Sequence, residues 1–151
     1  METTLPLAAR HAFTLVRDFR VHQRWIPLTR IEAPIGPAEL GDAVVAVSAG
    51  FFPDRMRVTG LTAPGELTPG AVTVTKEGPV LRGSSTITLT PIGPEQTVVA
   101  WEEDVWLAGP LPARLTRALL APAFAAMLGH ALHRMRRDAV ALARVRDARR
   151  R

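Results

Sequence analysis

The sequence predicts a single α+β domain in which one long C-terminal helix packs over a curved, antiparallel sheet of seven strands. Six runs between residues 28 and 107 are rich in Val, Ile, Thr and aromatic residues, the composition typical of strands. Only short segments rich in glycine and proline separate these runs, so we expect consecutive strands to pair antiparallel. Beyond the GPLP turn at 109–112, apolar residues repeat at helical spacing almost to the end of the chain.

The N-terminal region supplies the seventh strand and two short helices. Residues 2–7 form a short run that ends near a proline, which favours an edge strand. Apolar residues at spacings of four and three predict a helix over 8–19. A second short helical segment is predicted over 18–25, and it must end before Pro27 because a proline disfavours helix in the residue ahead of it.

Alternation along the later strands predicts which side chains face the core. The six strands are expected over residues 28–33, 43–51, 55–62, 71–77, 83–91 and 97–107. In the last of them, Val99, Trp101, Glu103 and Val105 share one face and Trp106 points to the other. We therefore expect an apolar concave face that carries one carboxyl group.

The C-terminal helix is predicted over residues 113–148, with Pro122 forcing a kink or a break in its first third. Arginines occupy much of one side, and an apolar stripe on the other side is expected to lie on the sheet. The stripe consists of Leu115, Leu119, Phe124, Met127, Leu128, Leu132, Met135 and Leu142.

Composition narrows the class of protein. With 47% apolar and 22% charged residues in 151, the chain suits one folded domain spanning 1–151 and not a disordered one. The N-terminus has no signal-peptide pattern and no run has the length of a membrane span, so we expect a soluble, cytoplasmic protein. The chain has no cysteine, which excludes disulfides, thiolate metal sites and cysteine nucleophiles.

The positive charge is confined to the end of the chain. Eight arginines and two aspartates from Arg134 onward give +6, whereas the whole chain carries +5, so the remainder carries −1. The basic tail, from about residue 144, lacks interleaved aromatic residues, which argues against specific nucleic-acid binding and leaves transient contact with an anionic membrane open. We expect a monomer or a homodimer.

Local motifs then suggest a family. The segment AFTLVRDFRVHQRWIP at 12–27, the LGDAVVAV strand at 40–47, residues 85–91, the TVVAW strand at 97–101 and the GPL turn before the last helix occur in a characteristic order. In these residues the chain resembles the SRPBCC superfamily, which comprises START-like, polyketide cyclase/dehydrase and coenzyme-Q-binding proteins. The resemblance implies a helix-grip fold with a cavity between the last helix and the sheet. It also implies that the region of Trp25 lies near the cavity entrance.

Candidate site residues follow from the strand and helix patterns and from the family resemblance. We expect the ligand-binding wall to comprise Trp25, Met56, Trp101, Glu103, Phe124, Met127 and Leu128. Glu103 is a weak candidate for acid/base catalysis, since a carboxyl group in an apolar cavity has a raised pKa, although a bulge there would leave it in water. His130 and His133 are expected to be solvated, and His11 and His22 to lie on the surface, so no metal site is predicted. No nucleotide or Walker fingerprint is present, and we expect no cofactor.

Three functions remain compatible with the sequence. The first is the binding or transport of a small hydrophobic molecule, such as a lipid, quinone or polyketide, without catalysis. The second is an enzyme that resembles polyketide cyclases and dehydrases, with Glu103 or a histidine moving protons. The third is an interaction protein that docks through its basic C-terminal helix.

Overall fold

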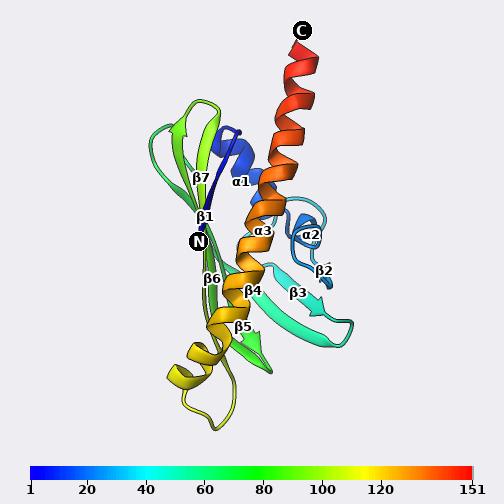
Figure 1. Ribbon diagram of the computed structural model, residues 1–151, viewed down its shortest axis with the longest axis vertical. Coiled ribbons are helices and arrows are strands. Elements are labelled where there is room, and N and C mark those ends of the chain that lie inside the picture. Colours follow the sequence, from blue (N-terminus) through cyan, green and yellow to red (C-terminus); the bar gives the residue numbers. More distant parts are fainter. Residues whose placement is uncertain (151) are drawn as a thin grey trace.

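A seven-stranded antiparallel sheet curls around the long C-terminal helix α3, as predicted (Figure 1). The computed structural model describes residues 1–150. Each strand from β2 to β6 pairs with the next, and β7 also pairs with β1, which gives the order β1-β7-β6-β5-β4-β3-β2. The strands are β1 (Glu2–Leu5), β2 (Thr29–Glu32), β3 (Ala43–Ser48), β4 (Phe52–Thr62), β5 (Gly70–Gly78), β6 (Leu81–Gly93) and β7 (Gln96–Leu107). The helices are α1 (Ala9–Arg17), α2 (Phe19–His22) and α3 (Ala113–Arg150).

The hydrophobic core lies between the concave face of the sheet and the three helices. In β5 and β7 every second side chain is buried, which is the alternation expected of strands with one face on a core. Val99, Trp101 and Val105 are buried, as their shared face predicted. The side chain of Glu103 is also inside, so no bulge turns it toward water.

The two short helices cover one end of the concave face. Helix α1 buries Ala12, Phe13 and Val16, whose spacing places them on one side. Asp18 separates α1 from α2, and its carboxylate accepts a hydrogen bond from the backbone N–H of Arg20 at 3.2 Å. This cap satisfies a free N–H at the start of α2 and so fixes where the chain turns.

Of the kink or break predicted at Pro122, the break is not found, because α3 continues through this residue. Pro122 removes one backbone hydrogen bond, but it lies on an exposed part of the helix where water can reach the freed carbonyl. Figure 1 shows the first turns of α3 tilted away from the axis of the later turns, which is consistent with the kink that proline causes.

Three residues of the predicted apolar stripe are exposed instead of packed on the sheet. They are Leu115, Leu119 and Leu142. Helix α3 packs on β7 and β1, and its C-terminal turns extend past the sheet (Figure 1). Its first turn contacts β7, because the backbone N–H of Leu107 donates to the hydroxyl of the buried Thr116 at 3.3 Å. By length and composition alone α3 could cross a membrane, and only 22% of its most apolar stretch is buried.

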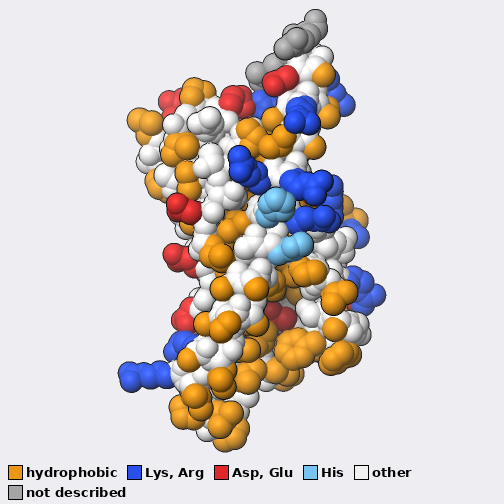
Figure 2. Space-filling view, in the orientation of Figure 1, with side chains coloured by type: hydrophobic (Ala, Val, Ile, Leu, Met, Phe, Trp, Pro, Cys, Tyr) orange, Lys and Arg blue, Asp and Glu red, His pale blue; other side chains and the backbone are white. Residues whose placement is uncertain are grey.

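The two ends of α3 carry different kinds of side chain. Figure 2 shows apolar side chains gathered around the N-terminal end of the helix and arginines around its C-terminal half. Arg146 of the predicted basic tail pairs with Glu95 at 3.0 Å, so this part of the tail contacts the domain. Arg151 lies outside the described residues.

Gly83 permits the close approach of β6 to β7. Its φ of +120° is rarely adopted by residues with a side chain, and an added Cβ would lie 1.9 Å from the carbonyl oxygen of Asp104. A glycine is therefore required where these two long strands cross the site described next.

Candidate functional site

A mostly apolar cavity of about 170 Å³ lies between the concave face of the sheet and helices α2 and α3. Strands β2 to β7 and both helices contribute to its wall. The lining residues are Phe19, His22, Ile26, Thr29, Ile31, Ala46, Ser48, Phe52, Asp54, Met56, Val72, Val74, Lys76, Leu81, Ser85, Ile87, Trp101, Glu103, Phe124 and Met127. Because most of these side chains are apolar, the cavity favours a hydrophobic occupant.

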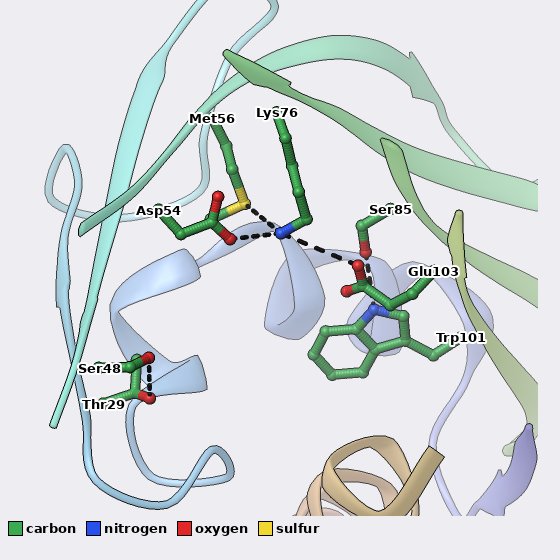
Figure 3. Close-up of polar contacts among 8 residues, drawn as sticks. All are labelled: Thr29, Ser48, Asp54, Met56, Lys76, Ser85, Trp101 and Glu103. Atoms are coloured by element: carbon green, nitrogen blue, oxygen red, sulfur yellow. Dashed lines mark hydrogen bonds and ion pairs between the residues drawn. The ribbon is translucent and has the colours of Figure 1, made fainter. Parts of the chain in front are cut away.

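Four neighbouring strands bring a polar cluster to one end of the cavity (Figure 3). The cluster consists of Asp54 on β4, Lys76 on β5, Ser85 on β6 and Glu103 on β7. Ser85 and Glu103 are direct partners in the β6–β7 register, and Lys76 lies opposite Met56 across β4 and β5. The antiparallel register therefore places residues from distant parts of the chain side by side.

Lys76 is the centre of this cluster and is only 4% exposed. Its ammonium group forms an ion pair and hydrogen bond with Oδ2 of Asp54, and it lies 3.8 Å from Oε2 of Glu103 and 3.6 Å from the sulfur of Met56. A buried ammonium group is costly unless it is paired, and the two carboxylates provide that pairing. With both carboxyl groups ionised, the cluster carries two negative charges and one positive charge.

Glu103 lies in an environment that disfavours its ionised form. Its side chain is 6% exposed, and burial raises the pKa of the carboxyl group, while Lys76 and the Ser85 hydroxyl oppose that shift. The indole N–H of Trp101 donates to the Ser85 oxygen at 2.8 Å, which holds both side chains against Glu103. Raised pKa values of this kind are common among groups that transfer protons in active sites.

Two buried oxygens of the cluster have no hydrogen-bond partner among the described residues. They are Oδ1 of Asp54 and Oε2 of Glu103. Buried polar atoms are nearly always hydrogen-bonded in folded proteins, and each exception costs free energy. The polar end of the cavity is thus left with spare acceptor capacity.

His22 lines the cavity and is 3% exposed, so the prediction of a surface histidine was wrong. Burial lowers its pKa to about 4, which keeps the ring neutral at physiological pH. Its Nε2 lies 2.8 Å from the carbonyl oxygen of Val16, and since a carbonyl only accepts, Nε2 carries the proton. The ring packs against the rings of Trp25 and Trp101, at centroid distances of 4.8 Å and 5.4 Å.

A second, neutral polar pair lies away from the charged cluster. The hydroxyls of Thr29 and Ser48 are 3.0 Å apart and both residues line the cavity (Figure 3).

At the hairpin between β3 and β4, Phe52 lines the cavity whereas Phe51 is exposed. The two adjacent aromatic rings at this hairpin therefore have different environments.

Five of the seven residues predicted to bind a ligand line this cavity, namely Met56, Trp101, Glu103, Phe124 and Met127. Trp25 and Leu128 belong to the core and not to the wall. Trp25 is fully buried behind His22, where its indole N–H donates to Oδ2 of Asp138 on α3 at 3.0 Å. That the lining residues bind a ligand remains a prediction.

The sequence analysis did not identify Asp54, Lys76, Ser85 or His22 as site residues. A signal for Lys76 was present, because alternation along β5 places it on the same face as the buried Val72 and Val74. His130 and His133 are exposed, as predicted. Within residues 1–150, no group of three or more histidine, cysteine or acidic residues could hold a metal ion.

Comparison with known families agrees with the fold. A model of the family described as "Polyketide cyclase / dehydrase and lipid transport" matches residues 1–140. The chain belongs to this family. No curated protein matches the chain. The membership confirms the predicted SRPBCC resemblance, and the family's description covers both lipid transport and cyclisation, so it does not choose between binding and catalysis.

Solved structures show the same fold at low sequence identity. The protein XoxI from Bacillus cereus has 13% identity and a TM-score of 0.66, with 95% of each chain covered. A START superfamily protein from Mycobacterium smegmatis has 14% identity and a TM-score of 0.61, covering 89% of this chain and 94% of that one. The Zhui aromatase/cyclase from Streptomyces sp. R1128 has 14% identity and a TM-score of 0.59, covering 92% and 90%. These similarities establish the architecture alone.

Proposed function

We propose that this chain binds a small, mainly hydrophobic molecule in the cavity between α3 and the sheet. The observation that carries the proposal is an apolar cavity whose charged cluster contains two buried oxygens that receive no hydrogen bond from the described residues. Apolar burial would drive binding at about 25 cal/mol for each Å² removed from water. Membership of a family described in terms of lipid transport and polyketide cyclisation supports the same class of ligand.

Native mass spectrometry of the purified protein, with mass spectrometry of its organic extract, tests this proposal. Ala46 lines the cavity on β3, and Ala46→Met would fill part of it. Ala43 lies on the same strand but is exposed, so Ala43→Met is a matched control. We expect a bound apolar molecule, or one added from a panel of lipids, quinones and polyketides, to be retained by Ala43→Met and lost by Ala46→Met. No bound mass with any compound would contradict the proposal.

A second candidate function is proton-transfer catalysis on the bound molecule by Glu103. It is favoured by the position of this carboxyl group, which lines the cavity with a raised pKa. Glu103→Gln separates the two functions, because a binding protein loses at most some affinity whereas an acid/base enzyme loses turnover. The molecule recovered from the extract would be incubated with both proteins and its products followed by mass spectrometry.

A further inference from the structure

We infer that the polar end of the cavity selects a neutral hydroxyl group, so that the ligand presents an alcohol or phenol to Glu103 and not a carboxylate or a phosphate. This inference rests on the proposed function and specifies the chemistry of the ligand's polar group. It depends on four features: the acceptors of the cluster that lack a hydrogen bond, the pairing of its lysine, the two protonation states of Glu103 and the size of the cavity beside the cluster.

The unpartnered atoms require a hydrogen-bond donor. Oε2 of Glu103 and Oδ1 of Asp54 are both buried acceptors that receive no hydrogen bond from the described residues, and the Lys76 ammonium group lies 3.8 Å from Oε2, beyond hydrogen-bond distance. The carboxyl group of Glu103 lies beside the ring of Trp101, which also lines the cavity (Figure 3). Because Glu103 lines the cavity, a ligand hydroxyl beside its carboxyl group would supply a hydrogen-bond donor, whereas an ether or ketone oxygen can only accept.

An anionic ligand is disfavoured because Lys76 is already paired. Its ammonium group contacts Asp54 and lies 3.8 Å from Glu103, so the cluster has one cation for two carboxyl groups. A ligand carboxylate would add a third carboxyl group to a site with little access to water. Like charges repel strongly where solvent is excluded, so such a ligand is expected to bind less well than its uncharged analogue.

A hydroxyl also suits both protonation states of Glu103. When the glutamate is ionised, the hydroxyl donates to it; when the glutamate is protonated, the hydroxyl can accept its proton in a hydrogen bond. Burial raises the pKa of this carboxyl group, which extends the pH range in which its protonated form is present. An ammonium group can only donate, so it could not accept the proton of the protonated carboxyl group in a hydrogen bond.

The cavity limits the part of the ligand that reaches the cluster to about one ring. An engineered apolar cavity of about 150 Å³ holds one benzene molecule, and the cavity here is about 170 Å³. The smallest probe of the inference is therefore a single aromatic ring with one substituent that can be varied. Toluene, 4-methylanisole, 4-methylphenol and 4-methylbenzoate form such a series.

The series would be titrated at pH 7 by calorimetry against the wild type, Glu103→Gln and Glu102→Gln. Glu102 neighbours Glu103 on β7 but is exposed on the opposite face, so its variant controls for the change of charge. In the wild type we expect 4-methylphenol to bind about tenfold or more tightly than toluene, as expected for a hydrogen bond to a charged group. 4-Methylbenzoate should bind more weakly than toluene. Glu103→Gln should reduce the preference for the phenol and strengthen binding of the benzoate, and Glu102→Gln should change neither.

Two outcomes would overturn the inference in distinguishable ways. If toluene, the anisole and the phenol bind equally well, or if the benzoate binds best, the cavity binds apolar molecules but does not select a hydroxyl. If none of the four compounds binds to any of the proteins, the proposed function fails together with the inference. Loss of toluene binding in Glu103→Gln would show that the variant disturbs the cavity itself, and Glu103→Met then repeats the comparison without a polar side chain.

Discussion

Replacing Lys76 by methionine should destabilise the protein strongly, because the substitution leaves two buried carboxyl groups without a counter-charge. Glu103 lies 3.8 Å from the ammonium group, and at an effective dielectric constant of about 20 a carboxylate at that distance is attracted by about 4 kcal/mol. Asp54 is closer and is attracted more strongly. Removing the lysine also removes the cost of burying its charge, which is several kcal/mol. We therefore expect a net loss of about 3–5 kcal/mol in the free energy of unfolding, the range found when buried pairs are broken.

Urea denaturation at pH 7 measures this loss, with Arg55→Met as the control. Arg55 is an exposed cation on β4, so its replacement should change stability by less than about 0.5 kcal/mol. Combining Lys76→Met with Asp54→Asn and Glu103→Gln should recover much of the loss, because the remaining groups are neutral. A loss below about 1 kcal/mol in Lys76→Met would refute the argument, since it would mean that water solvates the cluster.

The effect of Lys76→Met should also depend on pH. Lys76 lowers the pKa of Glu103, so its removal raises that pKa further above the unfolded value of about 4.3. A carboxyl group whose folded-state pKa is raised costs stability as pH rises through that pKa. The difference between Lys76→Met and the wild type should therefore shrink as pH falls toward 4.

Three further predictions concern residues around the cavity. Because burial lowers the pKa of His22 from 6.5 to about 4, the folded state binds fewer protons than the unfolded chain between these pH values. Lowering the pH across that window should cost the wild type about 3 kcal/mol more than His22→Gln in urea denaturation; equal slopes would refute neutral burial. Gly83→Ala should lower stability by about 3 kcal/mol or more, whereas Gly36→Ala, with a positive φ but open space, should cost about 1 kcal/mol. Asp138→Ala should cost about 1–3 kcal/mol by leaving the indole N–H of Trp25 unpaired, and Trp25→Phe should remove most of this difference in thermal unfolding.

Most of the fold could be predicted because its signals are local. Alternation with a period of two placed Trp101 and Glu103 on the inner face without knowledge of any partner strand. Short connections rich in glycine and proline dictated an antiparallel meander. The apolar stripe of α3 was predicted less well, because the exposure of Leu119 depends on which side of the helix faces the sheet, and helical spacing alone does not determine this.

The site was harder to predict because its polar groups come together only through register. Lys76 shares its face with Val74, but Asp54 reaches it from β4 across an irregular register between Arg55 and Met56. Trp25 resembled a wall residue in sequence, yet its partner Asp138 lies 113 positions later on α3. Both assignments depend on contacts between distant segments, which strand parity and helical period do not determine.

The four methionines allow the central claim to be tested most directly. Met56 and Met127 line the cavity, whereas Met135 is buried in the core and Met1 is exposed. The chain would be labelled with ¹³C at the methionine methyl groups and titrated with 4-methylphenol while the four NMR signals are followed. Binding in the cavity predicts saturable shifts of the Met56 and Met127 signals with a common dissociation constant, and little change at Met1 and Met135. Shifts confined to Met1, or no shift at any ligand concentration, would contradict the claim that this cavity holds a small hydrophobic molecule.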